Sequence, residues 1–224
     1  MNITWLGQAG LIFETVGFRI MVDPYLSDSV GEIDPEKHRR TPVDPRFFSV
    51  KPDVLIFTHD HLDHYDPETV RHFLSPSTDV LVLSPRSVYE KVRKTGGKNR
   101  YVLFRPGSVW TEKSVRFTAV PAEHSDPEAI GVIIDDGEKK YYVTGDTLYN
   151  ESIFPELPPD IHAVFLPVNG VGNNMNMADA ARFASKTGAS VVCPVHIGLF
   201  DDLSADGFPC DRKVNLEIYR ETVL

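Results

Sequence analysis

Short runs of apolar residues, separated by turn-forming residues, make up the N-terminal part of the chain. Glycine-containing turns at 7–10 and 16–17 interrupt these runs, and Asp23-Pro24 ends the last of them. Runs of this length, bounded by glycine and proline, are typical of β-strands. The pattern therefore predicts three strands, over residues 3–6, 11–15 and 18–22.

Residues 25–50 interrupt this pattern with a long polar connection. Pro35, Pro42 and Pro45 fall within it, and we expect a segment of this composition to form neither helix nor sheet. Long loops in compact domains are usually functional or mobile. The segment is therefore a candidate lid over a site, or a candidate subunit contact in an oligomer.

Beyond residue 50 the pattern alternates between strands and helices. Asp66-Pro67 supplies an N-cap and a proline at the first helical position, so we expect a helix to about Leu74. Ser84-Pro85 starts a second helix, to about Lys94, and Asn176 caps a third that runs to about Thr187. Apolar runs predict strands over residues 53–57, 80–83, 101–104, 114–120, 130–135, 140–144, 163–168 and 190–195.

The order of these elements favours one domain with two sheets. Strands arrive in antiparallel groups, and helices separate the later strands, which is typical of two β-sheets sandwiched by helices. No linker, repeat or low-complexity tract divides residues 1–224. We therefore expect a single domain of the α/β (α+β) class.

Composition and charge narrow the range of partners. Hydrophobic content of 42% and charged content of 25% are ordinary for a globular protein. A net charge of −9 argues against a nucleic-acid partner, because neutralising phosphates requires a basic surface. Two cysteines are too few for a disulfide framework, and neither a signal peptide nor a membrane span is visible. We expect a cytoplasmic protein without a membrane partner.

The segment His59-Asp60-His61-Leu62-Asp63-His64 is the strongest chemical signal. It places three imidazoles and two carboxylates in six consecutive positions, directly after the apolar run 53–57. Histidine is the commonest nitrogen ligand of zinc and related metals, and carboxylates complete such sites. A solvated polar loop is the alternative, but such a loop has no need of three closely spaced histidines. The segment therefore predicts a metal site.

Three further residues repeat one local design, in which an apolar strand ends in a potential ligand. His124, Asp146 and His196 each follow such a run. Rigid sheets present side chains at their strand ends, where ligands gather. Taken singly, each residue could be an ordinary hydrogen-bonded histidine or a turn aspartate. Together with the histidine-rich segment, they favour metal ligands.

This order of residues resembles the metallo-β-lactamase superfamily, whose pattern is His-x-His-x-Asp-His, then a histidine, an aspartate and a final histidine. The resemblance implies an αββα sandwich of two mixed β-sheets flanked by helices, with two divalent metal ions at the sheet edges. It implies that His59, His61 and His124 hold one ion, that Asp63, His64 and His196 hold the other, and that Asp146 bridges them. Asp23 matches an early family aspartate that supports a ligand, although a turn residue before Pro24 is the alternative.

A narrower resemblance links the chain to the L-ascorbate-6-phosphate lactonase branch of that superfamily. It implies zinc or manganese and a phosphorylated sugar lactone, and it is specific for the branch rather than for the substrate. Four segments carry it: Trp5-Leu6-Gly7-Gln8-Ala9-Gly10, Asp23-Pro24-Tyr25-Leu26-Ser27-Asp28, Leu166-Pro167-Val168-Asn169-Gly170 and Pro194-Val195-His196-Ile197-Gly198-Leu199-Phe200.

The implied metals suggest a mechanism. Two divalent ions that share a water lower its pKa from 15.7 to roughly 7, which gives hydroxide at neutral pH. The hydroxide would attack a carbonyl carbon or a phosphorus atom. Asp63 or Asp146 would orient this nucleophile or carry its proton. We therefore expect a metal-dependent hydrolase that acts on a small anionic lactone or ester.

Proteins with this ligand pattern can also have other functions. Phosphodiester hydrolysis of small or cyclic nucleotides is the main alternative. Di-iron redox members of the superfamily carry a carboxylate where this chain has His61, and thiolester hydrolysis of the glyoxalase II type needs a C-terminal basic segment that we do not find. A non-catalytic metal-binding protein is the remaining alternative, and the full ligand complement argues against it.

Two loops are candidate anchors for an anionic substrate. Asn169 and Gly170 begin a glycine-containing loop before a helix start, where backbone amides can hold an anion. His38, Arg39 and Arg40 lie in the long early loop, and arginine suits phosphate geometry. The alternatives are an ordinary strand-to-helix turn for the first loop and a solvated surface for the second.

Overall fold

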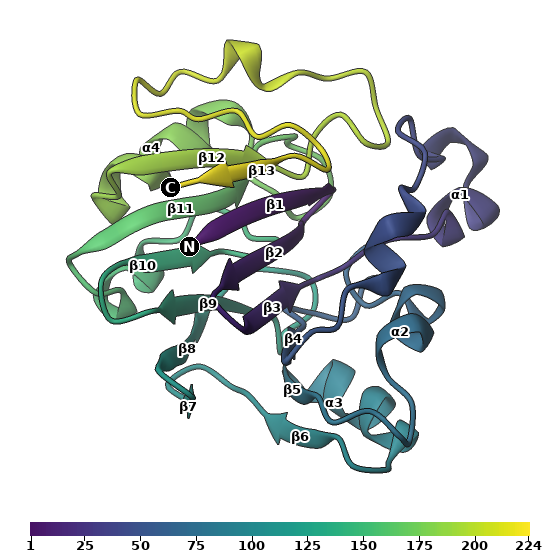
Figure 1. Cartoon of the computed structure of the whole chain (residues 1–224). Coiled ribbons are helices and arrows are strands. Elements are labelled where there is room, and N and C mark those ends of the chain that lie inside the picture. Colours follow the sequence, from purple (N-terminus) through teal and green to yellow (C-terminus); the bar gives the residue numbers. More distant parts are fainter.

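Two β-sheets packed face to face form the centre of the computed structural model, which describes all of residues 1–224 (Figure 1). The first sheet has seven strands: β1 (Asn2–Gly7), β2 (Gly10–Thr15), β3 (Phe18–Val22), β4 (Val54–Ile56), β5 (Leu81–Ser84), β6 (Arg100–Leu103) and β13 (Glu221–Val223). The second has six: β7 (Val109–Glu112), β8 (Val115–Pro121), β9 (Ile130–Asp135), β10 (Lys140–Val143), β11 (Ile161–Pro167) and β12 (Val191–Val195).

Both sheets are mixed. In the order β13-β1-β2-β3-β4-β5-β6, the strands from β13 to β3 pair antiparallel and those from β3 to β6 pair parallel. In the order β12-β11-β10-β9-β8-β7, β12, β11 and β10 are parallel and the rest are antiparallel. Because parallel strands of one sheet end at the same edge, the residues that follow β10 and β12 can meet.

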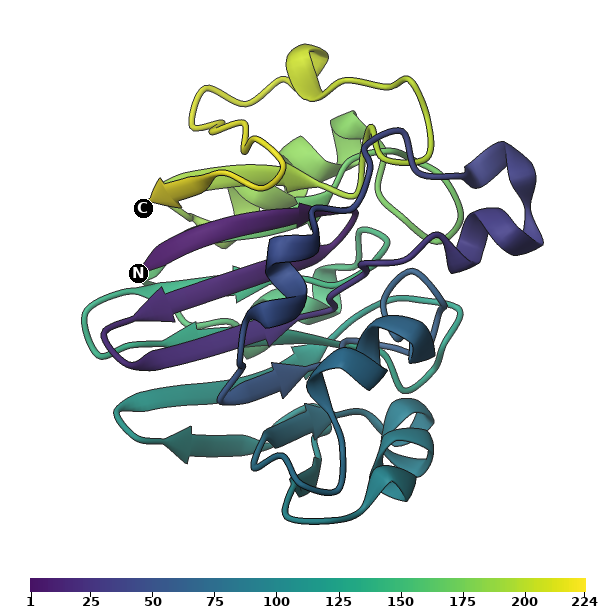
Figure 2. The same ribbon diagram turned by 45° about the vertical axis from the view of Figure 1, so that its right-hand side comes forward.

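Helices cover the outer faces of both sheets. The first sheet carries α2 (Pro67–Phe73) and α3 (Arg86–Val92) on its outer side, and α3 packs on β5 and β6. The short helix α1 (Ser29–Ile33) projects beyond the ends of the strands (Figure 2). The second sheet carries α4 (Met177–Thr187), which packs on β11. The expected αββα sandwich is thus confirmed. No helix combines the length and the apolar character needed to cross a bilayer.

Three apolar cores hold these four layers together. The largest lies between the sheets and includes Phe13, Phe117 and Phe165. A second fills the space under α4, where Phe183 is buried, and a third lies under α2 and α3, where Phe73 is buried. Burying a side chain of this size contributes roughly 1.5–3 kcal/mol. The two outer cores fix the helices, and the central core fixes the sheet edge that carries the site.

The expectation that residues 25–50 form no helix was wrong. The segment contains α1 and two 3-10 helices, η1 (Pro35–Lys37) and η2 (Pro45–Ser49). In η1 and η2 the proline occupies the first turn, where its missing N–H costs nothing. The side chains of Asp34 and Asp44 accept hydrogen bonds from the first-turn amides. These prolines therefore begin short helices rather than prevent them.

Several elements went unpredicted because they are short or lie at edges. β13 pairs with β1 at the edge of the first sheet, and β7 forms an edge of the second. Both strands have exposed positions and lack a continuous apolar run. The 3-10 helices η3 (Arg93–Thr95), η4 (Glu151–Glu156) and η5 (Ala205–Gly207) likewise carry no apolar periodicity.

Candidate metal centre

The histidine-rich segment forms a tight turn directly after the central strand β4. The amides of His64 and Tyr65 both donate to the carbonyl of His61, at 3.0 and 2.8 Å. This turn folds the segment back on itself. Histidines that are adjacent in sequence therefore present their rings to two neighbouring positions in space.

The other three candidate ligands come from the second sheet. His124 lies three residues beyond β8, Asp146 lies three beyond β10, and His196 directly follows β12. His196 adopts a left-handed backbone conformation with φ 57°, which turns the chain sharply as it leaves the strand. The structure thus brings all seven candidate ligands to one edge of the sandwich.

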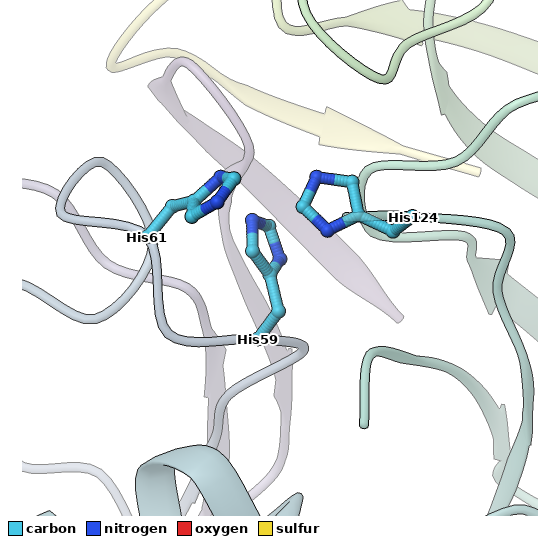
Figure 3. Close-up of side chains that lie close together, drawn as sticks. All are labelled: His59, His61 and His124. Atoms are coloured by element: carbon cyan, nitrogen blue, oxygen red, sulfur yellow. The ribbon is translucent and has the colours of Figure 1, made fainter. Parts of the chain in front are cut away.

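His59, His61 and His124 form one possible metal site, which we call trio A. One ligand atom from each lies within 4.8 Å of the others. The ring centroids are 4.7 Å apart for His59 and His61, and 4.3 Å apart for His59 and His124. Figure 3 shows His59 and His61 on one segment and His124 on another, with the three rings converging. His59 is buried, His124 is half-buried and His61 is exposed.

Asp63, His64 and His196 form a second possible site, trio B, again with ligand atoms within 4.8 Å. The Asp63 carboxylate lies 3.2 Å from Nε2 of His196. Asp146 lies between these histidines, with Oδ1 3.1 Å from Nε2 of His64 and Oδ2 3.2 Å from Nε2 of His196. Because Asp146 also groups with His59 and His64, its carboxylate is within reach of both sites.

Asp23 lies behind trio B and contacts a ligand directly. It is fully buried, and its carboxylate accepts a hydrogen bond from Nδ1 of His64 at 2.8 Å. It also accepts from the Thr58 amide at 2.8 Å and from the Thr58 hydroxyl. This arrangement holds the His64 ring so that Nε2 faces the centre, which is how carboxylates behind ligating histidines act.

Three amide side chains complete the surroundings of trio B. Nε2 of Gln8 lies 2.8 Å from the Asp63 carboxylate and 3.0 Å from Nε2 of His196. Nδ2 of Asn169 lies 3.2 Å from Nδ1 of His196, and Asn174 donates to Asp146 at 2.8 Å. Asn169 is one of the predicted substrate anchors and Asn174 ends the same loop, whereas Gln8 is not among the predicted site residues.

In the sequence, Gln8 stands in a glycine-containing turn within the segment Trp5 to Gly10, and no ligand pattern singles it out. Its backbone has φ 49°, and its carbonyl accepts from the His196 amide at 2.8 Å. Without the fold, nothing connects that turn to a histidine at the other end of the chain. This contact became visible only in three dimensions.

Electrostatics differ between the two trios. Burial lowers the pKa of His59 and of His124, and neighbouring imidazoles lower both further. Burial also opposes the charge of His64 and His196, but Asp146 and Asp63 outweigh it and raise both pKa values, to about 9 for His196. His59 and His124 are therefore neutral at pH 7 and ready to bind metal, whereas His64 and His196 of trio B hold protons that a cation would replace.

The aspartates show the complementary shift. Burial raises the pKa of Asp63 and of Asp146, but the nearby His64 and His196 charges outweigh it and lower both pKa values below the ordinary range. Both carboxylates are therefore anionic at neutral pH. Buried anions of this kind require a positive partner.

Three buried atoms at the centre make no hydrogen bond of good geometry: Nε2 of His59, Nε2 of His64 and Oδ1 of Asp146, although the last two lie 3.1 Å apart. Buried polar atoms are normally satisfied, so such a cluster needs an explanation. All three are atoms that coordinate divalent metals. The residues present therefore fit a bound metal, which would satisfy all three atoms.

A pocket of about 320 Å³ opens onto the centre. Five candidate ligands contribute to it, together with Asn169, Asn174 and Gln8. The remaining walls come from the early segment, from the loop after β11 and from the turn after β12: Val30, Lys37, Val171, Gly172, Asn173, Phe200 and Asp201.

The proposed arginine anchors do not line this pocket, and neither do His38 and Gly170. The guanidinium of Arg39 is buried and donates to the carbonyls of Tyr25 and Thr41 and to the hydroxyl of Tyr219. Arg40 faces Asp202, with its Nε 3.5 Å from that carboxylate. Arg39 thus ties the early segment to the C-terminal one, because its planar fork suits three fixed acceptors.

Comparisons with known proteins agree with this architecture. Residues 18–197 match the family described as "Beta-lactamase superfamily domain". A UPF0173 metal-dependent hydrolase of Caldivirga maquilingensis is 29% identical, over 91% of this chain and 85% of the relative. Another, from Aeropyrum pernix, is 27% identical over 95% of this chain and 89% of the relative.

A solved structure supports the fold. Igni18, a metallo hydrolase from Ignicoccus hospitalis, superposes with a TM-score of 0.78 at 18% sequence identity. The alignment covers 99% of this chain and 97% of Igni18. The family match extends over most of the chain and includes every candidate ligand, from His59 to His196. The chain therefore belongs to the beta-lactamase superfamily and is a metal-dependent hydrolase with the metallo-β-lactamase fold.

Proposed function

We propose that the protein is a dinuclear hydrolase that opens a small anionic lactone or cleaves a small anionic ester, as in the L-ascorbate-6-phosphate lactonase branch. In this proposal trio A and trio B each hold one divalent ion, zinc or manganese, and Asp146 contacts both. The observation that carries it is the position of the Asp146 carboxylate. One oxygen lies 3.1 Å from His64 and the other 3.2 Å from His196, within reach of His59.

When bound, two such ions lower the pKa of a water molecule to roughly 7 and polarise the bond to be cleaved. The chain's own residues would then orient the reacting groups and accept or donate protons. The Asp63 side chain is 18% exposed and that of Asp146 only 7%, so Asp63 is the better placed to take a proton in the pocket. Gln8 holds the Asp63 carboxylate in place through its Nε2 atom.

The pocket walls support a small substrate with little negative charge. Lys37 is the only lysine or arginine that lines the pocket. Its ammonium group lies 3.1 Å from Asp34, and its side chain is 54% exposed. One such cation, together with the metals, can attract a single anionic group. Val30 and Phe200 provide apolar contact beside it.

Phosphodiester hydrolysis remains the alternative, because the same ligands would serve an attack on phosphorus. Enzymes that bind several phosphates usually provide arginine for bidentate contacts. No arginine lines this pocket, which argues against substrates that carry several phosphates.

A paired assay tests the proposal. Zinc- and manganese-loaded protein is given a phosphorylated sugar lactone and, separately, bis-p-nitrophenyl phosphate. We expect faster opening of the lactone, and loss of that activity in His61→Ala. Faster cleavage of the phosphodiester would replace the proposal by its alternative. Equal rates in wild type and His61→Ala would exclude trio A from the reaction.

A further inference from the structure

Asp126 is a buried carboxylate that no step of the proposed reaction uses. It lies two residues beyond His124 and is 9% exposed. Oδ1 accepts from the Glu128 amide at 2.9 Å. Oδ2 accepts from the Ser87 hydroxyl at 2.6 Å and from the Asp60 amide at 3.3 Å. Burying a carboxylate is costly unless hydrogen bonds compensate, and here three donors from three segments converge on one group.

The Asp60 contact reaches into trio A. Asp60 lies between the two ligands His59 and His61, so its amide belongs to the backbone that sets the spacing of their rings. The loop that carries Asp126 makes a second contact of the same kind, since the Ile130 amide donates to the Thr58 carbonyl at 2.9 Å. The segment after β8 is therefore joined to the ligand turn on both sides of His59.

The third ligand of trio A comes from the same loop. The amide of Asp126 lies 3.2 Å from Nδ1 of His124, and the Ser125 hydroxyl lies 3.5 Å from Nε2 of His61. These are the only hydrogen-bond contacts of the His61 and His124 rings. Asp126 thus connects the loop of His124 to the backbone between His59 and His61.

Helix α3 supports this connection from outside. Ser87 and Lys91 are one helical turn apart and face the same way. Ser87 donates to Asp126, while the Lys91 ammonium lies 2.6 Å from the Asp60 carboxylate. A rigid helix therefore holds both ends of the contact between Asp126 and Asp60.

We infer that Asp126 is a positioning residue for trio A, which sets the distance between its two ligand-bearing segments and hence the affinity of its metal. This inference rests on the proposal that trio A holds a divalent ion. Outer contacts of this kind change metal affinity by about 10- to 100-fold when removed. Asp126 touches no residue of trio B, so the effect is confined to one of the two metals.

Titration of the metal-free protein with cobalt(II) tests the inference. Bound equivalents are counted by atomic absorption after dialysis, and visible absorption bands report coordination. Asp126→Ala is compared with Asp136→Asn as control, because Asp136 likewise accepts hydrogen bonds from two backbone amides, those of Glu138 and Lys139, but in the turn between β9 and β10. We expect Asp126→Ala to weaken, by about 10- to 100-fold, the binding of the cobalt ion that His61→Ala removes.

Two more variants keep the test decisive. Ser87→Ala removes one of the three donors and should weaken the same ion less than Asp126→Ala does. Asp126→Asn preserves the side-chain volume, and its cobalt affinity is measured instead if Asp126→Ala does not fold. Wild-type affinity for both ions in folded Asp126→Ala or Asp126→Asn would overturn the inference. If wild type binds no ion that depends on His61, the proposed dinuclear site itself fails, before any Asp126 variant is measured.

Discussion

Trio A and trio B lie next to each other, with the rings of His59 and His64 3.9 Å apart, yet they are supported in different ways. Trio A consists of three imidazoles, and its exposed member His61 has one distant hydroxyl as its only hydrogen-bond contact. Trio B contains a carboxylate, and the side chains of Asp23, Gln8 and Asn169 contact its ligands directly.

The difference shows two ways of preparing a metal site. Side-chain hydrogen bonds and opposite charges organise trio B before any metal arrives. Trio A depends mainly on the backbone of two loops and on the Thr58 hydroxyl, which lies 3.0 Å from Nδ1 of His59. Burial lowers the pKa of His59 and His124, so these two histidines are neutral. We therefore expect the trio B ion to bind more tightly and the trio A ion to exchange first.

The largest expected effect comes from the residue that the trios share. Asp146→Ala removes the carboxylate that lies within reach of both sites, so both ions should bind more weakly. Metal ions supply several kcal/mol of transition-state stabilisation, and we expect kcat/KM to fall by roughly 10³-fold or more. Steady-state kinetics and metal counting on the same sample check this. Unchanged metal content would show that Asp146 holds neither ion.

Substitution of one histidine from each trio compares them directly in metal-free protein. His64→Ala leaves the fully buried Asp23 carboxylate without its imidazole partner, and breaking a buried pair costs about 3 kcal/mol or more. His61→Ala changes an exposed side chain and should alter stability by less than about 0.5 kcal/mol. Urea unfolding with excess chelator measures both free energies. Equal losses would contradict the contrast between the trios.

In the absence of metal, His196 of trio B and His59 of trio A should change the free energy of unfolding in opposite directions as pH rises. The pKa of His196 is raised to about 9, so its stabilising contribution is complete below about 6.5 and is lost as pH rises through 9. The pKa of His59 is lowered, so the unfolded chain binds its proton first and stability falls as pH drops below about 6.5.

Unfolding free energies measured from pH 5 to 10 check both slopes. One group changes stability by at most about 1.4 kcal/mol per pH unit. His196→Gln should flatten the slope between about 6.5 and 9, and His59→Gln should flatten it on the acid side. If His196→Gln leaves the alkaline slope unchanged, the charge of His196 does not stabilise the metal-free centre.

The smallest expected effect concerns Gln8. Gln8→Ala removes the amide that contacts both Asp63 and His196. Trio B then loses a hydrogen-bonding group that positions two of its ligands, but it keeps all three ligands. We expect its metal to bind about 10-fold more weakly while trio A is unaffected. Competition with a coloured chelator measures both affinities. A matching loss at trio A would mean that Gln8 acts on the whole centre.

The regular elements were predictable wherever local patterns were strong. The apolar runs of β11 and β12 and the caps of α2 and α4 identified those elements correctly, since Asp66 and Asn176 do accept hydrogen bonds from first-turn amides. β7 and β13 were missed because an edge strand is defined by its pairing partner, not by its own hydrophobicity. α1 was missed because a helix of five residues is too short for periodicity to appear.

The amino-acid sequence alone determined the kind of chemistry that the protein can perform. Ligand type depends on side-chain identity, and seven histidines and aspartates at the ends of apolar runs are visible without coordinates. Only the tertiary structure decided how those ligands are supported and what lines the pocket. Gln8 meets His196 across 188 positions, and Asp126 meets Asp60 across 66. Such contacts arise from the packing of two sheets, and no local pattern in either segment encodes its partner.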